Sequence, residues 1–146
     1  MSKITRQINI ISRCQALFRA SRLRESEICA YNNYVIPICR NPGLSQEQIA
    51  RRVYLDKYNV TRHLAKLEQM GYVDRRPSDS DKRITLVYPT EKLLAMLPEV
   101  RQTISDWDSY LFEGLEPEEL EQFEATLLKI TQRAKEYVNS KDVIEG

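Results

Sequence analysis

The N-terminal part of the chain carries hydrophobic residues at helical spacing. Over residues 4 to about 24, apolar positions recur every three or four residues between arginines, which predicts an amphipathic helix. A second helix is expected to begin at Ser26, a good N-cap, and to end before Asn41. Pro37 should kink or break this helix one turn early, because proline lacks the N–H donor and clashes with the preceding turn.

Two further helix signals follow in close succession. Residues 45–48 form a capping box ahead of a short apolar face, which predicts a helix of about three turns. Residues 56–59 are another capping signal, and the helix they open should close at Gly71. A short helix, a tight connection and a longer helix make a helix-turn-helix candidate. The inward positions of the longer helix are Val60, Leu64 and Leu67.

After Gly71 the hydrophobic period changes to that of strands. Residues 72–76 can form one strand, residues 84–88 alternate on a second, and residues 77–80 between them are turn formers. The pattern predicts a β-hairpin. Asp81 and Arg83, two apart on a strand, should share a face, where the carboxylate can orient the guanidinium. Four cations flank the tip of the hairpin: Arg75, Arg76, Lys82 and Arg83.

Two long helices are predicted after the hairpin. The first opens at Thr90 and runs to about Leu111, with Pro98 expected to bend it. The second begins at Pro117, and its apolar stripe of about two and a half heptads suits it to packing on a partner helix. The tail from Asn139 is expected to fray.

The composition of the chain suits a single domain, and its charged residues are unevenly distributed along the sequence. The 146 residues are 42% hydrophobic and 29% charged, enough for one buried core. No apolar run suits a membrane span or a signal peptide, so a cytoplasmic protein is expected. Residues 1–50 hold seven Lys/Arg against three Asp/Glu, residues 51–90 nine against five, and residues 91–146 six against thirteen. One part of the molecule is therefore expected to meet an anion.

The sequence gives little support for catalysis or metal binding. Cys14, Cys29 and Cys39 form no CxxC pair and are expected to be reduced thiols. His63 is the single histidine, so a His-rich metal site cannot form within one chain, although a mixed carboxylate site stays open. Without a phosphate-binding glycine loop or a serine elbow, no enzyme and no cofactor is expected.

A helix-turn-helix beside a basic hairpin is a way to hold duplex DNA, with a helix in the major groove and the hairpin on the backbone or minor groove. On the exposed face of the second helix, Arg62 can fork onto a guanine edge and Asn59 can pair with an adenine edge. His63 lies at the margin of the buried stripe, where packing is favoured over base contact. The other candidate contacts on this face are Lys57, Tyr58, Thr61 and Lys66.

Residues 44–92 resemble the winged-helix core of the MarR family of bacterial and archaeal transcription regulators. The helices on either side agree in order and length, and the sequence N-P-G precedes the capping box. The matching signatures are N-V-T-R at 59–62, L-E-x-x-G at 67–71, R-R-P-S-x-x-D-K-R at 75–83 and P-T-E-K at 89–92.

The resemblance implies a mainly α fold with a small β-hairpin wing, that is, an α+β winged helix-turn-helix. Residues 1–146 would form a single domain, with residues 26–90 as the DNA-binding lobe and residues 1–25 and 91–140 as dimerisation helices. A homodimer would read the two halves of a pseudo-palindromic operator on double-stranded DNA, commonly as a repressor.

The resemblance also implies roles for individual residues. Thr61 and Arg62 would lie in the major groove, and Arg83, held by Asp81, would serve the wing at the minor groove. The wing candidates are Arg75, Arg76, Ser78, Asp81, Lys82 and Arg83.

Many members of the family release DNA when a small aromatic or lipophilic effector binds between the dimer body and the lobe. Phe18, Tyr31, Tyr34 and Trp107 can line such a pocket, although aromatic residues on these helices are more often plain core. Cys14 invites comparison with members that sense peroxides through a cysteine in the first helix. A winged-helix module that grips another protein is the alternative from a different class, and it predicts no salt-dependent DNA affinity.

Overall fold

The computed structural model describes residues 2–23, 27–141 and 144. It is mainly helical with one small antiparallel sheet, which confirms the predicted fold class. In chain order the elements are α1 (Lys3–Arg22), the 3-10 helix η1 (Glu27–Tyr31), α2 (Asn32–Arg40), β1 (Leu44–Ser45), α3 (Gln46–Val53), α4 (Lys57–Gln69), β2 (Val73–Pro77), β3 (Thr85–Pro89), α5 (Glu91–Leu111) and α6 (Pro117–Ser140).

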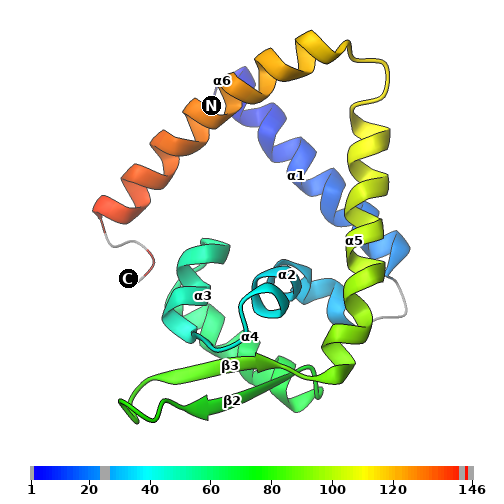
Figure 1. Ribbon diagram of the computed structural model, residues 1–146. Coiled ribbons are helices and arrows are strands. Elements are labelled where there is room, and N and C mark those ends of the chain that lie inside the picture. Colours follow the sequence, from blue (N-terminus) through cyan, green and yellow to red (C-terminus); the bar gives the residue numbers. More distant parts are fainter. Residues whose placement is uncertain (1, 24–26, 142–143, 145–146) are drawn as a thin grey trace.

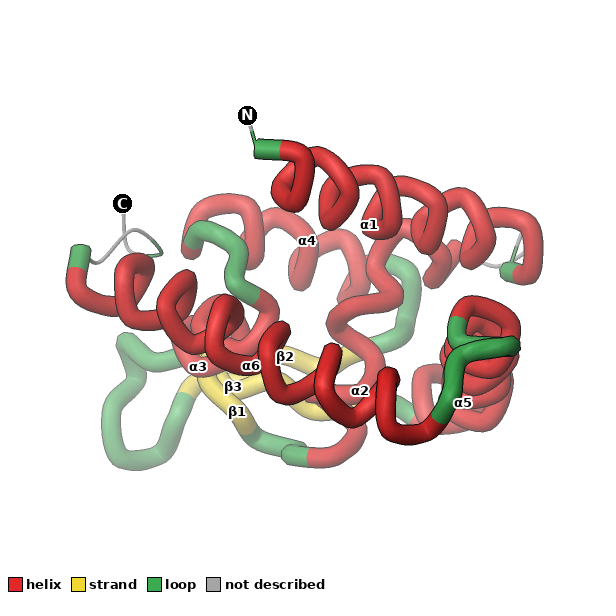
Figure 2. Tube along the Cα trace, turned by 90° about the horizontal axis from the view of Figure 1, so that it is seen from above, coloured by secondary structure: helices red, strands yellow, loops and turns green. Residues whose placement is uncertain are grey.

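The elements form a compact lobe and a framework of long helices. In Figure 1, α2, α3, α4 and the sheet make up the lobe at the bottom, α5 rises from it, and α6 crosses above it. Seen from above, α1 and α6 lie over different sides of the lobe (Figure 2). The continuous buried core belongs to the lobe and the start of α5, whereas neither α1 nor α6 contributes a buried residue.

The sheet has the strand order β1-β3-β2, with both pairs antiparallel. The predicted hairpin is β2 and β3, with Arg75 opposite Val87 in register. The second strand was predicted over residues 84–88. β3 begins at Thr85, so Ile84 belongs to the connecting loop. The sequence did not predict β1, because two residues show no alternation; β1 pairs with β3 through Leu44 opposite Val87.

Gly43 sets the entry into β1. Its φ of +90° lies in the left-handed region, and its N–H donates to the carbonyl of Val87 at 2.8 Å. A Cβ atom at this position would lie 3.3 Å from the ring of Tyr88. The N-P-G turn therefore needs glycine both for its backbone angle and for the close approach of β3.

The predicted break at Pro37 is wrong. Helix α2 continues through Pro37 to Arg40, and the N–H of Asn41 donates to the Pro37 carbonyl at 3.1 Å. Tyr34, Val35 and Ile38 of this helix are fully buried, so tertiary packing outweighs the single hydrogen bond that proline removes. The predicted start at Ser26 lies outside the described residues.

The predicted fraying of the tail from Asn139 falls largely outside the described residues, which include only 139–141 and 144 of the tail. Helix α6 continues to Ser140, and beyond it the side chain of Ile144 is only 5% exposed and belongs to the core of the lobe. The carbonyl of Ile144 accepts a hydrogen bond from the N–H of Lys57 at 2.9 Å. Burial of the Ile144 side chain removes its apolar surface from water and so stabilises its contact with the lobe.

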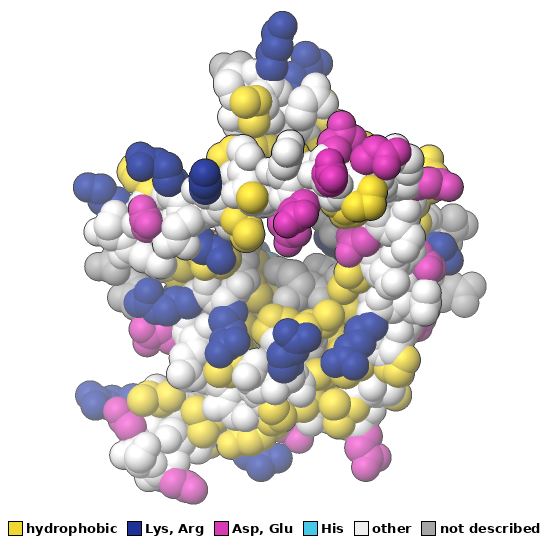
Figure 3. Space-filling model, turned by 45° about the horizontal axis from the view of Figure 1, so that its top comes forward, with side chains coloured by type: hydrophobic (Ala, Val, Ile, Leu, Met, Phe, Trp, Pro, Cys, Tyr) yellow, Lys and Arg dark blue, Asp and Glu magenta, His cyan; other side chains and the backbone are white. Residues whose placement is uncertain are grey.

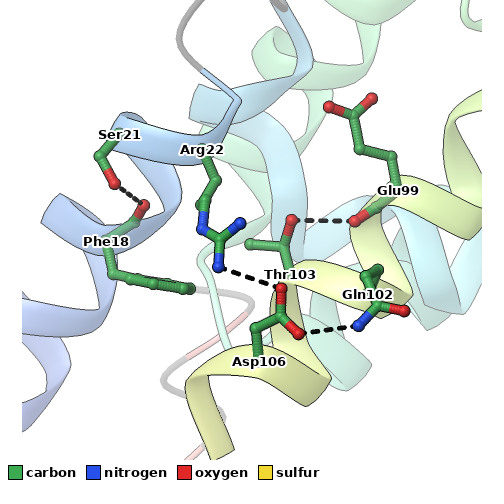
Figure 4. Close-up of polar contacts among 7 residues, drawn as sticks. All are labelled: Phe18, Ser21, Arg22, Glu99, Gln102, Thr103 and Asp106. Carbon is green, nitrogen blue, oxygen red and sulfur yellow. Dashed lines mark hydrogen bonds and ion pairs between the residues drawn. The ribbon is translucent and has the colours of Figure 1, made fainter. Parts of the chain in front are cut away.

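The C-terminal end of α1 is attached to α5. Arg22 forms an ion pair with Asp106 at 3.1 Å, and Gln102 donates to the same carboxylate at 2.7 Å (Figure 4). The rings of Phe18 and Trp107 lie 5.1 Å apart, and the Arg22 guanidinium lies over the Phe18 ring. These contacts fix one end of α1, so the direction in which its apolar N-terminal half extends is set.

Candidate nucleic-acid interface

Helix α4 begins at a well-formed cap. The carboxylate of Asp56 accepts hydrogen bonds from the backbone N–H of Asn59 at 2.9 Å and from the Asn59 side chain. These hydrogen bonds lower the pKa of Asp56, the backbone one most. The three residues predicted to point inward, Val60, Leu64 and Leu67, are fully buried. The helix is therefore held rigidly, and its opposite face is free.

The exposed face of α4 gathers the predicted recognition residues. The Arg62 guanidinium donates to the Asn59 side-chain oxygen at 2.7 Å, which completes a chain from Asp56 through Asn59 to Arg62. This chain holds the two candidate base readers side by side. A shallow depression of about 450 Å³ covers the same face, and its lining is Lys57, Tyr58, Thr61, Arg62 and Ala65.

The remaining residues of this face have distinct settings. Tyr58 is 79% exposed, a setting in which its ring contributes little to the core. The Thr61 hydroxyl donates to the Lys57 carbonyl at 3.0 Å, and Lys66 is exposed outside the depression. Ala65 was not predicted, because a small apolar residue carries no hydrogen-bonding signal, yet such a residue suits contact with a thymine methyl group.

The guanidinium of Arg75, a predicted wing residue, is bound to helices α3 and α4 of the lobe. It donates to Glu68 of α4 at 3.1 and 3.3 Å and to Gln46 of α3 at 3.1 Å. The backbone N–H of Arg75 also donates to Glu68 at 3.0 Å. Arg75 therefore fixes the hairpin to both helices of the helix-turn-helix.

The predicted contact between Asp81 and Arg83 is present, but in the loop rather than on a strand. The Asp81 carboxylate accepts from the Arg83 guanidinium through two bonds of 3.0 Å, and from the Arg83 backbone N–H at 3.0 Å. The last bond spans two residues, as in an Asx turn. These hydrogen bonds lower the pKa of Asp81. The Arg83 side chain is nevertheless 90% exposed, so an oriented cation projects from the loop.

The other wing candidates stabilise the hairpin or lie at its surface. Ser78 is buried, its N–H donates to the Ile84 carbonyl at 2.8 Å, and its hydroxyl lies 3.0 Å from that of Ser80. The Arg76 guanidinium lies over the Tyr88 ring at 4.6 Å. Lys82 is exposed and lies 3.7 Å from Asp79. The loop is thus closed from within, and its cations stay accessible.

A polar contact behind α4 was missed by sequence reasoning. The Tyr34 hydroxyl lies 2.8 Å from Nδ1 of His63, and the Tyr31 and Tyr34 rings both meet the imidazole edge to face. Burial lowers the pKa of His63, which favours the neutral ring at pH 7, and a neutral Nδ1 without a proton can accept a hydrogen bond from the Tyr34 hydroxyl. Burial raises the pKa of Tyr34 to about 12. His63 therefore joins α4 to α2 and packs away from the exposed face.

Replacing Tyr34 by phenylalanine should destabilise the lobe by about 1 kcal/mol, because His63 loses its partner while the ring volume is kept. Urea unfolding at pH 7 measures the change in free energy. The matched control is Tyr58→Phe, since Tyr58 is largely exposed on α4, outside the helices proposed for dimerisation, and should lose no measurable stability. Equal stability of the Tyr34 variant and the wild type would contradict a stabilising role for the pair.

The four aromatic residues suggested for an effector pocket meet in two separate groups. Phe18 packs on Trp107 between α1 and α5, whereas Tyr31 and Tyr34 surround His63. Cys14 is exposed on α1, and burial raises the pKa of the Cys39 thiol. Within residues 2–23, 27–141 and 144, no group of three His, Cys, Asp or Glu side chains is placed to hold a metal ion.

Comparison with known proteins decides the family. The family model described as MarR family matches residues 38–84, from the end of α2 to the wing loop. The HTH-type transcriptional regulator BilQ of Clostridium symbiosum is 32% identical over 103 residues, which are 70% of this chain and 71% of BilQ. The chain belongs to the MarR family. The expectation of a transcriptional regulator rather than an enzyme is thereby confirmed.

Further similarity extends over nearly the whole of this MarR-family chain. The uncharacterized HTH-type transcriptional regulator YybA of Bacillus subtilis is 29% identical over 144 residues, 94% of this chain and 95% of YybA. The crystal structure of the transcriptional regulator SlyA superposes with a TM-score of 0.87 at 26% identity, covering 92% of this chain and 96% of SlyA.

A second solved structure includes nucleic acid. It is a putative MarR family transcriptional regulator from Listeria monocytogenes complexed with 26mer DNA. The two chains superpose with a TM-score of 0.86 at 22% identity, and the match covers 97% of this chain and 96% of the Listeria chain. At this identity the match shows that the fold is shared.

In the described part of this MarR-family regulator, no helix combines the length and the apolar character that a bilayer crossing requires.

Proposed function

We propose that this MarR-family regulator binds double-stranded DNA sequence-specifically, with α4 in the major groove and the wing loop at the minor groove. The observation that carries the proposal is the exposed face of α4, where Asp56 and Asn59 hold Arg62 beside an open depression. The Listeria relative, whose fold matches, is complexed with DNA, which supports the same use of the fold here.

Within this proposal each exposed side chain has a task. Arg62 forks onto a guanine edge, Asn59 pairs with an adenine edge, and Thr61 lies beside them in the major groove. Lys57, Tyr58 and Lys66 contact phosphates and fix the register. In the wing, Arg83 enters the minor groove in the orientation that Asp81 imposes, with Arg76 and Lys82 on the flanking backbone. Arg75 and Ser78 hold the wing in place.

We further propose that two chains form a homodimer through residues 1–25 and 91–140, with residues 26–90 as the DNA-binding lobe. Helices α1 and α6 line a groove of about 320 Å³ with apolar side chains, and none of their residues is buried within one chain. A soluble chain that exposes so continuous an apolar face covers it with a partner. The main apolar side chains of the groove are Ile4, Ile8, Ile11, Phe123, Leu127 and Ile130.

The dimer is proposed to repress transcription in the cytoplasm and to release its operator when a small aromatic or lipophilic compound binds. A reporter gene behind the DNA upstream of the chain's own gene tests the proposal in a host that lacks this gene. Expression of the chain should lower reporter output, and Arg62→Ala should not. Aromatic acids added one at a time should restore output if they are effectors. A rise in output on expression of the chain would contradict repression.

A further inference from the structure

The backbone N–H of Lys57, the first residue of α4, is hydrogen-bonded to a residue that follows α6. The N-terminal turn of a helix leaves N–H groups without partners inside the helix. The Asp56 side chain accepts from the N–H of Asn59, whereas the N–H of Lys57 donates to the carbonyl of Ile144 at 2.9 Å. A residue beyond α6 thus completes the cap of the helix that carries the candidate base readers.

The side chain of Ile144 strengthens this contact. It is only 5% exposed and packs in the core of the lobe, and Val138 in the last turn of α6 packs against the same core. A hydrogen bond and a buried apolar side chain act together at one residue. Ile144 is therefore attached to the start of α4 by its main chain and to the core of the lobe by its side chain.

Before its last turn, α6 reaches the lobe through the side chain of Lys135. A hollow of about 390 Å³ separates Lys135 of α6 from the ends of α2 and α3, and the Lys135 ammonium group lies 5.8 Å from the Tyr54 ring. Figure 3 shows a hollow below α6, with Lys and Arg side chains on its lower side and Asp and Glu side chains along its upper rim. The attachment at Ile144 is thus placed where it can control the position of α4 relative to α6.

We propose that Ile144 is a positioning residue for DNA recognition, which sets the place of each α4 relative to the dimerisation helix α6. The proposal rests on the proposed function, in which α4 reads DNA and α6 joins two chains. Two recognition helices must match half-sites about 34 Å apart, so a loose α4 would lower the fraction of dimers with the correct spacing. No residue of the DNA surface itself needs to change for affinity to fall.

The test compares Ile144→Ala with the conservative Ile144→Val and with Lys141→Arg, an exposed control that follows α6, keeps its charge and lies outside the proposed dimerisation segment. Fluorescence anisotropy on duplex DNA from upstream of the chain's own gene is measured at a temperature where circular dichroism shows all variants fully folded. Ile144→Ala should bind about five- to tenfold more weakly, because fewer molecules are competent, whereas Ile144→Val should stay within about twofold. Wild-type affinity in a fully folded Ile144→Ala variant would overturn the proposal.

Amide hydrogen exchange in the absence of DNA separates this proposal from the proposed function. The Lys57 amide should be protected in the wild type and should exchange about tenfold faster or more in Ile144→Ala. If the wild type binds no DNA but Lys57 responds in this way, the proposed function fails and the attachment of α4 by Ile144 stands. If exchange at Lys57 is the same in both proteins, the proposal is wrong whatever the DNA measurement gives.

Discussion

Replacing Phe123 by aspartate is expected to convert the proposed dimer into a monomer. Phe123 is half-exposed within one chain and lines the apolar groove between α1 and α6 with Ile8 and Ile130. In the proposed dimer the partner covers this groove, and burying an unpaired carboxylate there costs several kcal/mol. Sedimentation velocity at micromolar concentration should show one species of half the wild-type mass.

The same substitution should weaken binding to a two-half-site operator by about 100-fold or more, because the second half-site is no longer bound by a linked lobe. Gln122→Asp is the matched control, since it introduces the same carboxylate one residue earlier, off the apolar stripe of α6. This control should remain dimeric. A dimeric Phe123→Asp variant would show that α1 and α6 are covered in some other way.

Replacing Arg62 by alanine is expected to cost about 1–3 kcal/mol of specific binding and to relax the preference at one base pair, as loss of a bidentate contact does. The structure places this guanidinium on the free face of α4, supported by Asn59 at 2.7 Å. Anisotropy with a set of operators that differ at single base pairs measures both effects. Full specificity in the Arg62 variant would exclude this residue as a base reader.

Arg83→Ala supplies the contrast to the Arg62 result. Arg83 projects from the wing loop and is oriented by Asp81, so its loss should weaken binding to all sequences alike. The slope of log affinity against log salt should flatten by about one unit, because one cation in the minor groove and the counterion that it displaces are lost. An unchanged slope would mean that the wing loop does not touch the DNA.

Features encoded by neighbouring residues could be predicted from the sequence. The capping box of Ser45 and Gln48 forms as expected, with bonds of 2.9 and 3.1 Å. The Asp56 cap, the buried stripe of α4 and the contact between Asp81 and Arg83 also depend on residues a few positions apart. Local spacing decides such features, so the printed sequence contains what is needed to find them.

Features that depend on distant residues could not be predicted. The partners of Arg75 are Glu68 and Gln46, and nothing in the sequence indicates that this cation, rather than Arg83, is held inside the protein. The hydrogen bond between Tyr34 and His63 likewise joins residues far apart in the chain. The core residues around Ile144 are distant in the sequence, so the burial of Ile144 is visible only in the folded lobe.

The charge division along the chain matches the arrangement of the proposed complex. The cationic residues 51–90 supply α4 and the wing, whereas the acidic residues 91–146 supply α5 and α6. Figure 1 places most of α6 above the lobe, on the side away from the wing. Salt screens charges that are separated by more than about 10 Å. Acidic side chains on the far side of the lobe therefore do not repel DNA that is bound at α4 and the wing.

The central claim is that this chain binds duplex DNA with sequence preference. Fluorescence anisotropy with the DNA upstream of its own gene, against scrambled DNA of the same length and composition, tests it at two salt concentrations. The account predicts tight binding to the first DNA, much weaker binding to the second, and a marked loss of affinity at the higher salt. Equal affinity for both DNAs, carried through a selection of genomic fragments without enrichment of any sequence, would contradict it.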